Sequence, residues 1–475
     1  MKIALVHEPY KYQKFTDKNY TGHLKFNQIS EGCPNEDTPI DLMYASSLLK
    51  EGGFETTIID AEGEKINKND TIKRVKNSEA DVVAFLVNYT TTGNIALDWI
   101  KSIKESKDII TIVWRGTTNQ YASTLLDLYF IDYVILDPGL KPLLKLLKEI
   151  RRGNENLSNI NGIAYRKDGE KIINSPKNSE KDLSKLPWPD RKNVNPINNK
   201  VLFTKSDAKT IVNTSTGCPF DCNFCEYGKM SVKRRSTDDV LLELKDIVMD
   251  KKIKVIRFGD PNFLIDKDRT RNISKGIINM ELEFDWTCMA RVDSVDRKTL
   301  KLMKEAGCQL IWYGIESGSQ KILNNLNKNI DLMDTKKSID LTRKSGIRPC
   351  GFFIIGSPGE TEKEIKRTIE FAKELPLFYA QFLKMVARPG TNLYEDVKEE
   401  LGYDYFEKLI KGEVEPMELP RPWTNLTNKE IDYWVKRGFK EFYLRPSQII
   451  KILGSVRSFK ELRDYLKEGI RLLKS

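Results

Sequence analysis

The chain has little histidine, no long apolar run and no regular cysteine framework, and each shortage excludes a class of protein. Its 475 residues include two histidines, His7 and His23, and neither lies near the cysteines clustered at 218–225. No uninterrupted apolar run approaches the roughly 18 residues of a membrane span, and the N-terminus lacks the cleavage region of a signal peptide. Seven cysteines without regular spacing do not form a secreted disulfide framework. We therefore expect a cytoplasmic protein without a membrane-spanning segment.

The charge of the chain is mixed rather than concentrated. Its 78 Lys and Arg residues outnumber 68 Asp and Glu residues, which gives a net charge of +10. A nucleic-acid surface would gather Arg and aromatic side chains in one tract, and the sequence shows no such tract. The composition therefore gives no specific nucleic-acid signal, and the length predicts two or three globular domains.

The first 150 residues alternate short apolar runs with amphipathic stretches. The predicted strands are Lys2–Glu8, Glu55–Asp60, Asp81–Val87, Ile109–Trp114 and Tyr133–Asp137. Helical stretches follow each of them, the first only after a long segment from Tyr10 to Thr38, which predicts a lid or a partner surface. Five such units predict an α/β fold with a doubly wound, five-stranded parallel sheet over residues 1–152, and a ligand site at the carboxyl ends of its strands.

The remaining chain divides into three predicted segments. Residues 153–204 form a linker with a hairpin that turns at Asp168–Gly169. Residues 205–398 resume the strand and helix alternation six times, which predicts a partial (β/α)6 barrel, too short to close the standard eight-unit barrel. Residues 399–475 are helical and rich in aromatic residues, and they predict a C-terminal helical cap, with an aromatic stripe facing the core as the alternative.

Three cysteines gather in the stretch GCPFDCNFCEYG at 217–228. They are Cys218, Cys222 and Cys225, and the other four cysteines stand singly. Zinc would need four tetrahedral ligands and finds no second pair of cysteines here. A dithiol redox site would leave Cys218 unused. An iron–sulfur cube held by three thiolates, with one iron open to another ligand, uses all three. The residues favour the cluster and leave zinc or structural thiols as alternatives.

The CxxxCxxC spacing after the first barrel strand resembles the radical SAM enzymes. The resemblance continues through segments at the ends of the later strands. These segments are Phe258–Phe263, Cys288–Asp293, Tyr313–Gly318, Phe353–Glu360 and Arg388–Tyr394. Because the segments match in order and spacing, the resemblance does not depend on any one of them.

This resemblance implies a 4Fe-4S cluster on the three cysteines and S-adenosyl-L-methionine at the open iron. One-electron cleavage of that molecule would yield a 5′-deoxyadenosyl radical, while the protein supplies position and excludes water. The residues assigned to S-adenosyl-L-methionine are Phe224, Asp260, Asn262, Arg291, Glu316, Ser317 and Gly356. A salt bridge inside the barrel is the alternative for Arg291 and Glu316, and no catalytic side chain beyond the cluster ligands is assigned.

The order of a doubly wound domain, a hairpin linker with LPWPD at 186–190 and this barrel resembles the cobalamin-binding radical SAM group, which includes class B-like methyltransferases. The resemblance implies cobalamin at the carboxyl ends of the first sheet. The implied contacts are Asn88, Tyr89, Thr90, Gly116, Thr117, Asp137 and Gly139. The sequence departs from the group at Trp114–Asn119 and Leu136–Leu140, and it lacks D-x-H-x-x-G, which excludes histidine ligation of cobalt from that motif. A domain that docks a partner or covers the substrate, without corrin, is the alternative.

The resemblance implies a cobalamin-dependent C-methyltransferase that acts on an unactivated carbon. A radical cyclisation, rearrangement or carbon–carbon coupling without methyl transfer is the alternative, and a non-catalytic metal-binding regulator is a distant third. An electron donor such as ferredoxin or flavodoxin is implied as a partner. The acceptor stays open among peptides, proteins, lipids and other large molecules, because fold analogy cannot choose among them.

Overall fold

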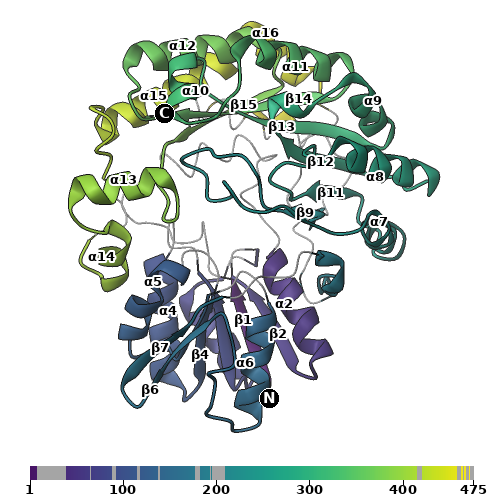
Figure 1. Cartoon of the computed structure of the whole chain (residues 1–475). Helices are drawn as coiled ribbons and strands as arrows, with labels where there is room; N and C mark the ends of the chain where they lie inside the picture. Colours follow the sequence, from purple (N-terminus) through teal and green to yellow (C-terminus); the bar gives the residue numbers. More distant parts are fainter. Residues whose placement is uncertain are drawn as a thin grey trace. The chain divides into compact units, whose positions relative to one another are not determined.

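The computed structural model describes most of the chain. The described residues are 1–7, 39–61, 63–64, 66–87, 93–114, 118–136, 140–176, 182–192, 194, 209–414, 420–456, 462, 463, 465, 466 and 470. They divide into two compact units (Figure 1). The first unit holds the described residues of Met1–Thr16, Glu36–Pro196 and Arg388–Pro420, and the second holds those of Ile197–Ala387 and Arg421–Ser475.

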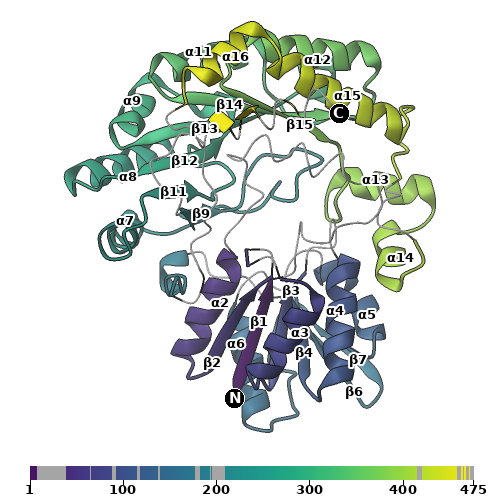
Figure 2. The same ribbon diagram turned by 180° about the vertical axis from the view of Figure 1, so that it is seen from behind.

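The first unit is built on a parallel sheet flanked by helices, as the alternating sequence predicted. Its parallel strands are β1 (Lys2–His7), β2 (Glu55–Asp60), β3 (Val82–Leu86), β4 (Ile110–Trp114) and β5 (Tyr133–Ile135). Its first helices are α2 (Ile40–Glu51), α3 (Lys68–Asn77), α4 (Gly93–Ser106), α5 (Thr118–Asp127) and α6 (Lys141–Arg151). The strand order is β2-β1-β3-β4-β5, which is a doubly wound order. Helices cover both faces of this sheet (Figure 2), so its strands are buried on both sides and are rich in apolar residues.

The hairpin at the end of this sheet extends it. β6 (Ile163–Lys167) and β7 (Glu170–Asn174) turn at Asp168–Gly169, where both residues have positive φ, as the Asp-Gly pair predicted. β6 pairs antiparallel with β5, so the sheet has seven strands rather than the five of its parallel part. A hairpin pattern in a sequence does not reveal which sheet edge it will join, so the sequence alone assigns these residues to a linker.

The second unit contains the predicted six parallel strands in sequential order. They are β8 (Lys209–Val212), β11 (Val255–Phe258), β12 (Asp285–Ala290), β13 (Cys308–Glu316), β14 (Arg348–Ile355) and β15 (Tyr379–Lys384). The helices between them are α7 (Thr237–Lys245), α8 (Lys267–Asn279), α9 (Arg297–Glu305), α10 (Gln320–Asn325), α11 (Leu332–Lys344) and α12 (Glu362–Glu374). Among the described strands, β8 pairs only with β11 and β15 only with β14, so this sheet is open at both ends, as a partial barrel is.

The region predicted as a C-terminal cap is divided between the two units. α13 (Asn392–Leu401) and α14 (Tyr405–Lys411) belong to the first unit, where α14 packs against α4 and α5. α15 (Asn428–Tyr443) and α16 (Pro446–Leu453) belong to the second unit, and α15 packs against β15 and α12. The aromatic side chains of α15 are mostly buried, including Trp434 and Phe439, so this stripe faces the core. None of the helices in the described ranges combines the length and the apolar character needed to cross a membrane.

Candidate active site

The three cysteines lie in a loop closed at its base by a short ribbon. β9 (Ser215–Thr216) pairs antiparallel with β10 (Lys233–Arg234), and the cysteine loop runs between them. Gly217 starts the loop at φ +84°, and a Cβ there would lie 2.4 Å from the Ser231 carbonyl oxygen, so only glycine fits. Cys225 N donates to Cys222 O at 3.1 Å, which winds the loop into a turn. All three cysteines and Phe224 are half-buried.

The cysteine loop is attached to residues 325–329, which begin at the last residue of α10 and which we call the 325–329 segment. Asn223 donates from its backbone N to Leu326 O at 3.2 Å and from Nδ2 to Asn325 O at 2.7 Å. Asn327 Nδ2 donates to Asp221 O at 2.6 Å. Asn327 has φ +49°, a conformation that asparagine tolerates better than most residues. The 325–329 segment thus fixes the cysteine loop through side-chain and backbone bonds.

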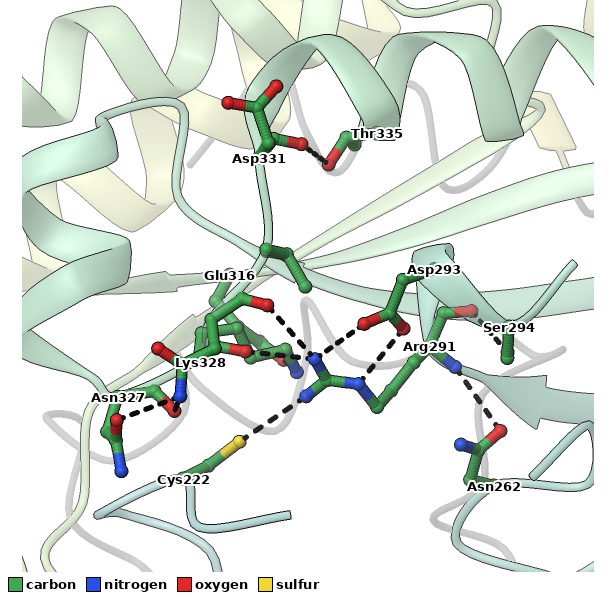
Figure 3. A network of polar contacts seen from close by, with 12 residues as sticks. Cys222, Asn262, Arg291, Asp293, Ser294, Glu316, Asn327, Lys328, Asp331 and Thr335 are labelled. Atoms are coloured by element: carbon green, nitrogen blue, oxygen red, sulfur yellow. Dashed lines mark hydrogen bonds and ion pairs between the residues drawn. The ribbon is translucent and has the colours of Figure 1, made fainter.

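A guanidinium group lies beside one of the cysteines. Arg291 Nη1 is 3.9 Å from Cys222 Sγ (Figure 3). The guanidinium carbon of Arg291 lies 3.7 Å from the centre of the Phe220 ring. Asp293 binds the same group bidentately, at 3.1 Å to Nε and 2.9 Å to Nη2, and the Lys328 carbonyl accepts from Nη2 at 3.0 Å. Arg291 is 6% exposed, so its charge acts on Cys222 with little screening.

A buried ion pair lies next to this group. Lys328 Nζ is 2.7 Å from Glu316 Oε1, and both side chains are 8% exposed (Figure 3). Glu316 has φ +65°, where the register of β13 against β14 shifts, and this irregularity places it opposite Lys328. Burial alone would lower the pKa of Lys328, but attraction to Glu316 and Cys222 outweighs it and raises that pKa. Burial raises the pKa of the Cys222 thiol, while Lys328 and Arg291 oppose that rise.

The side chains of two residues assigned to S-adenosyl-L-methionine already have hydrogen-bond partners within the protein. Asp260 is fully buried and accepts from Thr214 N at 2.7 Å, from Thr214 Oγ1 at 2.6 Å and from Ser215 Oγ at 2.6 Å. Ser317 is also fully buried, and its Oγ lies 2.9 Å from Thr368 Oγ1 of α12. Asp260 holds the strand end that leads into the cysteine loop, and Ser317 holds α12. Both side chains therefore hold neighbouring elements in place, and their contact with S-adenosyl-L-methionine stays a prediction.

Two other residues each have a buried polar atom that makes no hydrogen bond with the described part of the chain. They are Asn262 Nδ2 and Ser357 Oγ, in side chains that are 3% and 0% exposed. Asn262 Oδ1 accepts from Arg291 N at 3.4 Å, so its amide lies beside the cation. Gly356, at φ +85°, begins the turn that contains Ser357, and Trp423 Nε1 donates to its carbonyl at 2.8 Å. Buried polar atoms normally have partners, so these positions fit a polar ligand such as S-adenosyl-L-methionine.

The donor set fits a cluster better than a single ion. Within the described ranges, no group of three or more His, Cys, Asp and Glu residues could hold one metal ion. Zinc requires its ligands to converge on one centre, whereas each thiolate of a three-cysteine cluster binds its own iron. Cys288, Cys308 and Cys350 are buried on β12, β13 and β14, and the thiols of Cys288 and Cys308 are hydrogen-bonded neighbours.

The sequence did not predict several residues of this site. Phe220 and Asp293 lie within recognised motifs that assign them no role, and Lys328 lies outside every recognised motif, with its partner Glu316 on β13. The run Asn-Lys-Asn at 327–329 was the available signal, since two asparagines with positive φ flank the buried cation. The predicted cobalamin contacts, Asn88, Tyr89, Thr90, Gly116, Thr117, Asp137 and Gly139, lie outside the described residues, as does the segment 10–38.

Comparison with known proteins identifies both units. Residues 212–372 match the radical SAM superfamily, and residues 34–147 match the B12-binding domain. An uncharacterised methyltransferase of Pyrococcus horikoshii is 29% identical over 87% of this chain and 89% of its own length. The anaerobic magnesium-protoporphyrin IX monomethyl ester cyclase of Rubrivivax gelatinosus is 24% identical over 78% of this chain and 68% of its own.

Two solved structures share the fold. The cobalamin-dependent S-adenosylmethionine radical enzyme OxsB, with aqua-cobalamin and S-adenosylmethionine bound, has a TM-score of 0.71 and 18% identity, and covers 98% of this chain and 70% of its own. The radical S-adenosylmethionine methyltransferase TsrM of Kitasatospora setae, with cobalamin and a [4Fe-4S] cluster bound, has a TM-score of 0.65 and 16% identity, and covers 84% and 78%. The chain therefore carries a B12-binding domain at residues 34–147, ahead of a radical SAM domain at residues 212–372.

Proposed function

We propose that the chain is a cobalamin-dependent radical SAM methyltransferase that methylates an unactivated carbon atom of its acceptor. The observation that carries this proposal is the cysteine loop beside Arg291 and Lys328, in a chain whose first unit matches a B12-binding domain. The Pyrococcus horikoshii relative and TsrM are both described as methyltransferases, which supports methyl transfer over other radical reactions.

The site residues take separate roles in this proposal. Cys218, Cys222 and Cys225 would hold a 4Fe-4S cluster. The residues that would contact S-adenosyl-L-methionine are Phe224, Asn262, Arg291, Glu316, Lys328, Gly356 and Ser357. When bound, the cluster would supply the electron that cleaves S-adenosyl-L-methionine, and cobalamin would supply the methyl group.

The chain's own contribution is to place charge and exclude water. Arg291, held by Asp293 and the Phe220 ring, offsets the negative charge of the Cys222 thiolate in a half-buried loop. The Glu316–Lys328 pair fixes a second cation beside the same sulfur, since the two charges orient each other in a nearly dry setting.

The proposal includes a reductant and a compartment. Radical SAM chemistry needs an electron, and we infer ferredoxin or flavodoxin as its donor. The six described cysteines are free thiols, as expected in a reducing cytoplasm. The acceptor is not specified beyond an unactivated carbon.

Anaerobic reconstitution tests this function without a known acceptor. The wild-type protein with cobalamin, S-adenosyl-L-methionine and a low-potential reductant should form S-adenosylhomocysteine as well as 5′-deoxyadenosine, both measured by mass spectrometry. Cys222→Ala should lose iron and both products. Cys350→Ala, which changes a buried strand cysteine outside the loop, should keep them. Iron and sulfide analysis that shows no cluster in the wild type would contradict the proposal.

A radical cyclisation without methyl transfer is the second candidate. The Rubrivivax gelatinosus cyclase matches most of this chain, which favours this reaction as the alternative. The same assay separates the two candidates, because a cyclase would form 5′-deoxyadenosine without S-adenosylhomocysteine. That result would replace the methyltransferase proposal.

A further inference from the structure

Two cations and one carboxylate lie around the cysteine loop with little access to water. Arg291 Nη1 is 3.9 Å from Cys222 Sγ, and Lys328 Nζ is 2.7 Å from Glu316 Oε1 beside it (Figure 3). Burial raises the pKa of the Cys222 thiol, Lys328 and Arg291 oppose that rise, and Glu316 adds to it. Burial also raises the pKa of the Cys225 thiol, and Lys328 again opposes the rise. The charge of Lys328 therefore acts on two of the three sulfurs.

The charge that acts on these sulfurs is positive on balance. The side chains of Arg291, Lys328 and Glu316 are all buried, so their charges interact with the sulfurs through protein rather than through water. Asp293, the partner of Arg291, is 39% exposed, so water and salt screen its negative charge. Among the described residues of this network, two buried cations thus face one buried carboxylate.

An excess of positive charge beside cluster ligands favours the reduced form of a cluster. Reduction of a 4Fe-4S cluster from the 2+ to the 1+ state adds one electron, which the donor loses, so the cluster becomes more negative by one unit. A buried cation that is already in place attracts this added charge without having to reorganise. The reduction potential of an iron–sulfur cluster depends on local charge, on hydrogen bonds to its sulfurs and on exposure to solvent.

We propose that Lys328 and Arg291 raise the reduction potential of the cluster that the cysteine loop would hold, and that Glu316 fixes Lys328 in place while limiting this rise. A higher potential brings the cluster within reach of a low-potential protein donor such as ferredoxin or flavodoxin. The inference rests on the proposed function for the presence of the cluster, and it does not depend on cobalamin or on methyl transfer.

A redox titration of the cluster tests this role directly. The full-length, cluster-loaded protein is titrated anaerobically at pH 8, which favours ionised carboxylates, and without S-adenosyl-L-methionine or corrin, so that neither ligand affects the result. The electron paramagnetic resonance signal of the reduced cluster gives the reduced fraction at each potential. Lys328→Met should lower the ratio of reduced to oxidised cluster about tenfold at a fixed potential, which equals about 59 mV for a one-electron couple. Arg291→Gln, which removes the other cation, should act in the same direction.

The two members of the ion pair should shift the potential in opposite directions. Glu316→Gln keeps an oxygen that can accept from Lys328 and removes the negative charge, so the ratio of reduced to oxidised cluster should rise about threefold or more. Loss of the pair as a structural contact is common to both variants and would not produce shifts of opposite sign. Lys328→Arg keeps the charge and should stay close to the wild type. Lys337→Met removes an exposed lysine that is paired with Asp334 on α11, and it should leave the potential unchanged.

The outcomes separate this inference from the proposed function. Equal potentials in the wild type, Lys328→Met and Glu316→Gln, or shifts of the same sign in both variants, overturn the electrostatic role and leave the methyltransferase proposal intact. A wild-type protein that holds no cluster overturns both. Where Lys328→Met does not fold or retain iron, Glu316→Gln decides alone, because an unchanged or lowered potential in that variant overturns the inference.

Discussion

At the scale of single residues, the site owes its character to charges that the fold has removed from water. The side chains of Lys328 and Glu316 are each 8% exposed, and each buried charge is tolerable only because the other is 2.7 Å away. Removing one member of such a pair typically costs about 3–5 kcal/mol, because the other charge is left buried. A buried ion pair adds little net stability over an apolar pair of the same size, because both charges lose their water. We therefore expect this pair to serve the site rather than to stabilise the fold.

Glu360 is a second buried carboxylate, and its protonation links stability to pH. One of its oxygens, Oε2, accepts from Gly356 N at 2.6 Å and from Ser357 N at 3.1 Å, and within the described residues Oε1 has no partner. Burial, opposed by these bonds, raises the pKa of Glu360 from 4.5 to about 7. Because the folded state holds this proton more tightly, the contribution of Glu360 to stability is present below pH 4.5 and is lost as the pH rises to about 7.

Glu360→Gln should therefore remove part of the pH dependence of folding. Glutamine keeps an oxygen acceptor for the two backbone N–H groups and cannot ionise. We expect the wild type to lose on the order of 3 kcal/mol more than the variant between pH 4.5 and pH 8. Thermal melts of both proteins across this range measure the difference. Glu362→Gln, an exposed neighbour, is the control. Parallel curves for wild type and Glu360→Gln would show that Glu360 does not titrate in this window.

At the scale of elements, the 325–329 segment and the end of α10 join two loops of the site. Asn325 Nδ2 donates to Pro358 O at 2.9 Å, and Lys321 Nζ donates to Gly359 O at 3.0 Å, so this region also holds the turn after β14. The carbonyl oxygen of Asn325 accepts from Asn223 in the cysteine loop. Asn325 therefore binds the turn after β14 with its side chain and the cysteine loop with its backbone carbonyl.

Substitutions at Asn325 and Asn223 should separate these two functions. Asn325→Ala removes the bond to Pro358 O and keeps the carbonyl that holds the cysteine loop. We expect iron content to stay unchanged and S-adenosyl-L-methionine affinity to fall by about three- to tenfold, as for the loss of one hydrogen bond. Asn223→Ala should instead lower iron retention.

Iron analysis and anaerobic equilibrium dialysis of the cluster-loaded protein measure these two quantities. Asn324→Ala is the matched control, because Asn324 is an exposed neighbour on α10 whose Oδ1 accepts from Gln320. If Asn325→Ala lost iron and kept its affinity, the division of roles would be wrong.

Much of each element could be predicted from the sequence, because strand and helix periodicity is local. The parallel strands of both units, the Asp168–Gly169 turn and the cysteine loop after the first barrel strand follow from such local patterns. The Glu316–Lys328 pair could not be predicted, because it depends on a register shift in β13 and on the left-handed residues around Lys328. Asp260 was also assigned from its motif, and its contact with a ligand stays a prediction; its full burial against Thr214 and Ser215 is visible only in the folded chain.

At the scale of the whole molecule, the chain leaves the second unit after β15 and returns to it before α15. The intervening residues 388–414 belong to the first unit and contain α13 and α14. They are held there by a buried polar cluster. Tyr121 OH of α5 donates to Asp404 Oδ1 at 2.9 Å, and Tyr394 OH donates to the same oxygen at 2.6 Å. Burial raises the pKa of both tyrosines, so both hydroxyls remain protonated donors.

Tyr121→Phe should loosen residues 388–414 and leave the second unit intact. The change removes one hydrogen bond to a half-buried carboxylate, which is worth about 1.5–3 kcal/mol. Local opening governs cleavage when reclosing is fast, so tryptic cleavage at Lys398, Lys408 and Lys411 should accelerate by about tenfold or more. Timed digestion with mass spectrometry measures this rate, and iron content measures the second unit. Tyr129→Phe, which changes an exposed tyrosine near the end of α5, should digest like the wild type. Equal rates for all three proteins would mean that apolar packing of α14 on α5, and not the Asp404 cluster, holds these helices on the first unit.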